Sequence, residues 1–160
     1  MTYLALLMTA IAAVAVIVVI MTKQQAKRFR ALVTDHKELK ETRTVVDLPE
    51  DGIFMAIDDD SREIYCISHS KEIVIKIDDI EKVEVIEKEE DGEEGGISEI
   101  NVRIYLRNSD VETFDIECHE KMRSTIRHNS IIYHSVHNKA HAIANLLNEV
   151  IKEERSDLYY

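Results

Sequence analysis

The pattern of hydrophobic and polar positions divides this chain into three parts. Residues 1–22 contain no charged side chain. Residues 52–118 alternate between apolar and polar side chains, which predicts strands with one buried face. Residues 135–155 return to helical spacing, so we expect one amphipathic helix that packs on the sheet. The sequence therefore predicts an α+β chain that is mainly antiparallel β.

Six strands are expected in the alternating part, joined by polar turns that suit hairpins. They cover residues 52–58, 62–68, 71–77, 81–88, 97–107 and 111–118. Residues 119–133 lack a clear period, and their apolar run 131–133 is either a further edge strand or the start of the helix. The helix is expected to bury one stripe of apolar side chains, which consists of Ala140, Ile143, Ala144, Leu147, Val150 and Ile151.

The uncharged segment 1–22 is long enough to cross a membrane as a helix. A hydrocarbon core of about 30 Å needs about 20 helical residues. Four basic residues, Lys23, Lys27, Arg28 and Arg30, follow at once. By the positive-inside rule they stay in the cytoplasm, which predicts a cytoplasmic C-terminal domain. A cleaved signal peptide is the main alternative, but the run is long for one and no A-x-A exit follows it.

The remaining residues suggest one domain on a stalk. Residues 23–48 contain no glycine or proline, and we expect a basic juxtamembrane helical stalk or linker there. The only proline, Pro49, begins a Pro-x-x-Gly turn, where we place the start of the domain. The expected organisation is a transmembrane helix at 1–22, a stalk at 23–48, a β domain with its helix at 49–155, and a tail at 156–160.

The charge of the domain limits its partners. Residues 44–160 carry thirteen basic and twenty-eight acidic side chains, a net charge of −15. Such a domain repels phosphate backbones and lipid headgroups at long range. We therefore expect no nucleic acid partner and no bulk lipid binding by the domain. A protein partner is expected instead, and the sequence leaves both its identity and the oligomeric state open.

The order of elements resembles the bacterial pleckstrin-homology-like (PH-like) proteins with an N-terminal membrane anchor. The residues that carry the resemblance are the strands at 53–59 and 73–77, the link Asp78-Asp79-Ile80-Glu81-Lys82-Val83-Glu84-Val85, and the helix at 140–151. The resemblance implies a PH-like barrel or sandwich of six to seven strands, closed by a C-terminal helix and used as an interaction module. Eukaryotic members of the wider PH-like family often bind phosphoinositides through basic residues in the first hairpin loop. Here that loop is Asp58-Asp59-Asp60-Ser61, so this property does not carry over.

No catalytic or cofactor-binding residues are expected. The chain has no G-x-S-x-G, P-loop or dinucleotide motif. His137 and His141 share one helical face, but a zinc site needs three or four ligands and nothing at a suitable spacing completes this one. We therefore predict no metal site, and pH sensing by the histidines is a further hypothesis. The acidic runs at 58–60 and 89–94 are expected to be solvated turns.

The two cysteines separate the leading interpretation from its alternative. Cys66 and Cys118 fall at apolar positions of predicted strands, so we expect buried thiols in a cytoplasmic domain. The leading interpretation is a single-pass membrane protein that presents a cytoplasmic PH-like interaction module to a protein partner. The alternative is an exported envelope structural domain with a Cys66–Cys118 disulfide. A metal-dependent enzyme built on the histidines is a third, weaker hypothesis.

Overall fold

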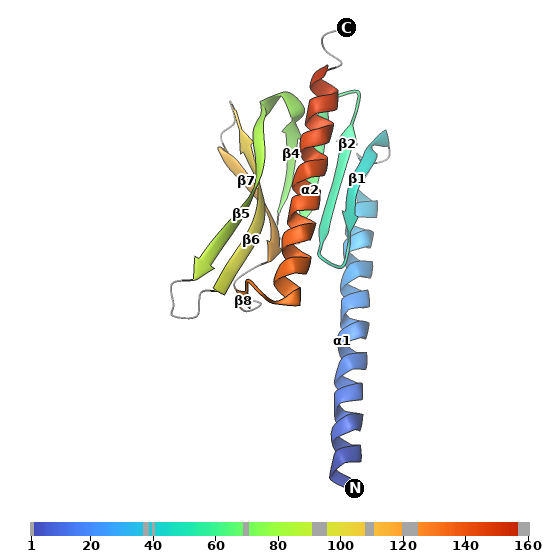
Figure 1. The fold of residues 1–160 in the computed structure, drawn as a ribbon. Helices are drawn as coiled ribbons and strands as arrows, with labels where there is room; N and C mark the ends of the chain where they lie inside the picture. Colours follow the sequence, from blue (N-terminus) through green and yellow to red (C-terminus); the bar gives the residue numbers. More distant parts are fainter. Residues whose placement is uncertain are drawn as a thin grey trace.

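The fold consists of a long N-terminal helix, two antiparallel sheets and a C-terminal helix (Figure 1). The computed structural model describes residues 2–36, 39, 41–68, 71–90, 96–107, 111–119 and 125–156, without the side chains of residues 2–7 and 10. The helices are α1 (Thr2–Asp35) and α2 (Ile131–Ser156), with a 3-10 turn η2 (Ile77–Asp79). The strands are β1 (Arg43–Leu48), β2 (Ile53–Asp58), β3 (Glu63–Ser68), β4 (Glu72–Lys76), β5 (Ile80–Glu90), β6 (Gly96–Leu106), β7 (Thr113–His119) and β8 (Ile126–Arg127).

Each sheet contains four strands. The first sheet has the order β1-β2-β3-β4, and in the second, β5-β6-β7, the short β8 pairs with β6. All six of these pairings are antiparallel. η2 joins β4 to β5 across the two sheets, which do not close into a barrel. The α+β class is therefore confirmed, whereas a closed barrel is not formed.

The six expected strands are present as β2 to β7, with ends that shift by one or two residues. The expected boundary of the domain at Pro49 is wrong, because residues 43–48 form β1 and pair with β2. The stalk that the sequence predicts at 23–48 includes this strand. The helical part of that stalk ends at Asp35. The run at 131–133 is the start of α2, where the amide of Tyr133 donates to Ser130 Oγ at 3.0 Å as a helix cap.

The main core lies between the two sheets and α2. The six buried residues of α2 are the predicted ones: Ala140, Ile143, Ala144, Leu147, Val150 and Ile151. They meet the inward residues of both sheets, among them Ile57, Ile64, Ile100, Val102 and Ile104, all fully buried. Burial of this apolar surface is the main stabilising force of the fold. In Figure 1, α2 runs along the open side between the two sheets.

Strand β2 is buried on both faces. Ile53, Met55 and Ile57 face the main core, whereas Phe54 and Ala56 belong to a second apolar cluster on the opposite face of the sheet. The cluster is completed by Ile67 of β3 and by Phe29 of α1. The end of α1 therefore packs against the outer face of the first sheet.

Candidate functional site

The first helix carries a long, exposed apolar surface. Side chains 11–21 are exposed all around the helix, and the large apolar ones among them are each at least half exposed. They are Ile11, Val14, Val16, Ile17, Val18, Val19, Ile20 and Met21. A helix that is apolar all round belongs inside a protein or inside a membrane. This surface is therefore the first candidate for a functional site.

The contact of α1 with the domain begins where the uncharged segment ends. Thr22, Ala26, Phe29 and Val33 are the partly or fully buried positions of the helix between residues 22 and 33. Their spacing of three and four places them on one helical face. Phe29 is the anchor of this face, at 4% exposure. Lys23, Lys27, Arg28 and Arg30 lie on the other sides, where the helix is exposed.

The structure itself does not identify a membrane span. Within the described residues, no helix reaches the combination of length and hydropathy that would take it across a membrane. The continuous helix from Thr2 to Asp35 and the exposure of its apolar side chains are the observations that the structure provides.

A polar cluster joins α2 to β5. Glu87 of β5 accepts hydrogen bonds from His137 Nδ1 at 2.6 Å and from Tyr133 Oη at 3.2 Å. The ring of Tyr133 also contacts those of His128 and His134, and the rings of His137 and His141 lie 4.4 Å apart between centroids. Burial, followed by the charge of Glu87, raises the pKa of Tyr133.

The expected pair His137 and His141 does come together, but as a ring contact and not as a ligand set. In the part of the chain that the structure describes, no group of three or more His, Cys, Asp or Glu side chains is arranged to hold a metal ion. The carboxylate of Glu87, which sequence spacing did not single out, is the partner of His137 instead. The cluster fixes the N-terminal half of α2 against the second sheet.

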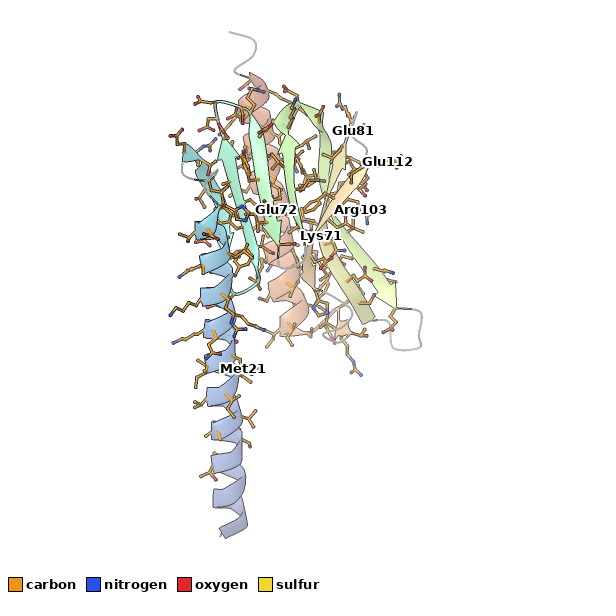
Figure 2. The ribbon with its side chains drawn as sticks, turned by 180° about the vertical axis from the view of Figure 1, so that it is seen from behind. Met21, Lys71, Glu72, Glu81, Arg103 and Glu112 are labelled. Atoms are coloured by element: carbon orange, nitrogen blue, oxygen red, sulfur yellow. The ribbon has the colours of Figure 1, made fainter. Side chains whose placement is uncertain are left out.

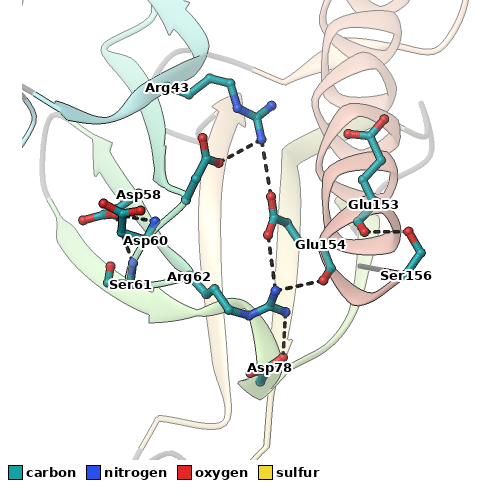
Figure 3. A network of polar contacts seen from close by, with 10 residues as sticks. Arg43, Asp58, Asp60, Ser61, Arg62, Asp78, Glu153, Glu154 and Ser156 are labelled. Atoms are coloured by element: carbon teal, nitrogen blue, oxygen red, sulfur yellow. Dashed lines mark hydrogen bonds and ion pairs between the residues drawn. The ribbon is translucent and has the colours of Figure 1, made fainter. Parts of the chain in front are cut away.

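A second polar network holds the C-terminal end of α2 (Figure 3). Glu154 pairs with Arg43 of β1 at 3.5 Å and with Arg62 of the β2–β3 turn at 3.4 Å. Arg62 also donates to the Glu154 carbonyl at 2.9 Å and to Asp78 of η2 at 3.2 Å. Arg43 donates to Asp59, and this bond raises the pKa of Arg43. We call these five residues the clasp, because they tie α2 to the first sheet and to η2.

The clasp contains a backbone conformation that the sequence did not suggest. Arg62 has a φ of 56°, the only positive φ of a residue other than glycine in the described chain. Such a residue costs of order 1 kcal/mol and is held only where its surroundings require it. Here the surroundings are the bonds of its guanidinium to Glu154 and Asp78. We interpret the clasp as structural.

The remaining expected sites are structural as well. The predicted turn at 58–60 is confirmed: Asp58 Oδ1 accepts from the amides of Asp60 at 2.9 Å and Ser61 at 3.1 Å. The bond from Ser61 lowers the pKa of Asp58 most. Of the acidic run at 89–94, the first two residues end β5, and residues 91–94 lie outside the described chain, as does the tail at 157–160.

The two cysteines are buried free thiols, as the leading interpretation expected. Burial raises the pKa of Cys66 to about 12 and that of Cys118 to about 11. The Cys66–Cys118 disulfide of the alternative interpretation is not present in the structure. Both side chains are part of the main core.

The outer face of the second sheet is covered by paired charges. Arg103 donates two hydrogen bonds to Asp115 on the next strand, at 2.7 and 2.8 Å, and this pairing raises the pKa of Arg103. Lys82 contacts Glu84 at 3.0 Å and lies over the ring of Tyr105 at 4.3 Å. Figure 2 shows Arg103 on this face, between the outer strands. We interpret these pairs as structural contacts between neighbouring strands.

Comparison with protein-family models, with curated proteins and with solved structures found no match for this chain.

Proposed function

We propose that this chain is a single-pass membrane protein that presents a cytoplasmic PH-like interaction module to a protein partner. The observation that carries the proposal is the apolar surface of α1, which is exposed on all sides up to Met21 and is followed at once by Lys23 and Lys27. Exposed in water, this surface would be strongly unfavourable. This surface belongs to the uncharged segment 1–22, which as a helix has about the length of a bilayer core.

The arrangement of the domain supports the second half of the proposal. Two antiparallel sheets with a final amphipathic helix packed along them is an arrangement compatible with the PH-like order of elements. The docking of Phe29 fixes this domain to α1, so the module would be held at a set distance from the bilayer. The strongly acidic domain favours a protein partner with a basic surface over anionic lipid.

The anchor is tested by adding charge to the exposed surface of α1. In the variant Val14→Lys with Ile17→Lys, each lysine costs about 2.5 to 3.5 kcal/mol at the centre of a span. We expect the wild-type chain to stay with the membranes during an alkaline carbonate wash and the variant to be depleted from them. The control is Val74→Lys with Val111→Lys, two positions of the domain that are 45% and 46% exposed. Release of the wild-type chain into the wash would contradict the proposal.

The orientation is tested by fusing reporters after Tyr160. A reporter that works only in the cytoplasm is expected to be active, and one that works only outside is expected to be silent. The reverse result would place the domain on the far side and make the exported alternative the better one.

The partner is tested by chemical crosslinking in membranes of the native host. We expect one discrete crosslinked product, and we expect the same product from the control variant with substitutions at Val74 and Val111.

A further inference from the structure

The lower rim of the domain lies where the uncharged segment of α1 ends. Side chains 8, 9 and 11–21 of α1 are exposed, and the stripe that faces the domain begins at Thr22. In Figure 2, the label of Met21 lies just beyond the end of the domain from which α1 emerges. The rim is therefore placed at the level of a bilayer surface if α1 spans the bilayer, an assumption that rests on the function proposed above.

The start of α2 lies at this same rim. Figure 1 shows α2 running roughly along α1, with its N-terminal end at the end of the domain from which α1 emerges, and Figure 2 shows the same from behind. An ion pair of 2.7 Å between Lys139 and Asp51 ties this half of α2 to the β1–β2 turn. The position of the helix end is thus fixed by contacts on two sides, because Glu87 holds His137 as well.

Two large aliphatic side chains stand unpacked at this end of α2. Ile131 is 88% exposed and Ile132 is 61% exposed, and Ile131 is the most exposed large apolar residue of the described chain. They precede the buried stripe of α2, whose first member is Ala140. Each isoleucine would gain of order 1.5 to 3 kcal/mol if it left water completely. The fold provides no core position for either of them.

We propose that Ile131 and Ile132 insert into the surface of the bilayer that α1 spans and so hold the domain against the membrane. Apolar side chains at an interfacial helix reach about 5 to 10 Å into the boundary between headgroups and acyl chains. The charges nearby are mixed, since His128 faces Glu89 at 3.9 Å and exposed Arg127 precedes His128 in the chain. The contact is therefore aliphatic, and it suits a zwitterionic surface such as phosphatidylcholine.

The chain contains no tryptophan, so one introduced tryptophan reports on its own surroundings. The full-length chain is reconstituted in phosphatidylcholine vesicles with and without bromine on the acyl chains, and bromine quenches only tryptophan in contact with lipid. The reporters are Ile131→Trp and Ile132→Trp. Ile17→Trp reports on the anchor, and Val74→Trp, on a strand of the first sheet, is the exposed control.

We expect brominated lipid to reduce the emission of Ile131→Trp, Ile132→Trp and Ile17→Trp, while Val74→Trp stays unchanged. Quenching of Ile17→Trp alone would overturn the insertion and leave the anchor intact. No quenching of Ile17→Trp would refute the anchor, and the insertion with it. A third outcome is an Ile132→Trp emission that is blue-shifted but not quenched, and that shifts to the red when the protein is diluted in lipid. This would show that a second copy of the chain covers this end of α2, which also overturns the insertion.

A tryptophan can draw a helix end into lipid by itself, so a second variant is needed. Adding Ile131→Asp to Ile132→Trp leaves the reporter in place and removes one of the two aliphatic contacts. We expect the double variant Ile131→Asp with Ile132→Trp to lose its quenching by brominated lipid. The control double variant, Val74→Asp with Ile132→Trp, should be quenched as strongly as Ile132→Trp alone. Equal quenching in the two double variants would show that the native isoleucine at 131 does not contribute to insertion into the bilayer, and would overturn the proposal.

Discussion

Replacing Phe29 by alanine should release α1 from the domain. Phe29 is the only aromatic contribution of the helix to the second apolar cluster, where it packs against Phe54, Ala56 and Ile67. Substitution of a buried phenylalanine by alanine costs about 3 to 5 kcal/mol in a closed core. Half-buried Val33 borders this cluster and can close part of the space. We therefore expect a loss below this range, about 2 kcal/mol.

The measurement is hydrogen exchange of the α1 amides between residues 23 and 35, in the full-length chain reconstituted in lipid. A loss of 2 kcal/mol in docking raises the population of the undocked helix about 30-fold. Exchange of this segment should rise accordingly while that of α2 stays unchanged, because α2 belongs to the main core. Leu32→Ala is the matched control, since Leu32 lies on the same helix at 50% exposure. Equal exchange in the two variants would refute the role assigned to Phe29.

Three further predictions concern the domain. Leu147→Ala should lower the free energy of unfolding by about 3 kcal/mol, measured by urea denaturation, because Leu147 is fully buried, whereas exposed Glu149→Ala should change it by less than about 0.5 kcal/mol. Glu154→Gln should cost about 1 to 2 kcal/mol in the same assay, since it removes the negative charge that pairs with Arg43 and Arg62. An unchanged stability would show that these ion pairs do not stabilise the domain. The buried thiol of Cys66 should resist Ellman's reagent until the chain unfolds. Because its pKa of about 12 in the folded chain lies above the value of 9.0 for an exposed thiol, the free energy of unfolding should fall between pH 9 and pH 12 by up to about 1.4 kcal/mol per pH unit. The variant Cys66→Ala should show a smaller fall.

The elements with a strong period could be predicted from the sequence. The stripe of α2 from Ala140 to Ile151 and the alternation of β6 both follow from geometry that repeats every 3.6 or every two residues. These local rules work because each side chain meets only one environment, either core or solvent. Strand β1 was missed because its run Arg43–Leu48 is short, follows a long helical pattern and has only one fully buried residue, Val46.

The polar contacts could not be predicted in the same way. Glu87 and His137 are fifty positions apart, and Arg43 and Glu154 are further apart still. Only the packing of α2 against the sheets brings them together, and no local pattern encodes that packing. The docking of α1 did have a signal, since Thr22, Ala26, Phe29 and Val33 repeat at helical spacing. The basic residues between them concealed it.

The clasp also determines how the domain would bear mechanical load. Arg43 begins the first strand and Glu154 is close to the end of the last helix, so the two ends of the folded domain are joined directly by an ion pair of 3.5 Å. Tension between α1 and a segment bound to the C-terminal end would pass through this short link and would not first peel β1 from β2. The clasp would then be the first contact of the domain to carry such a load.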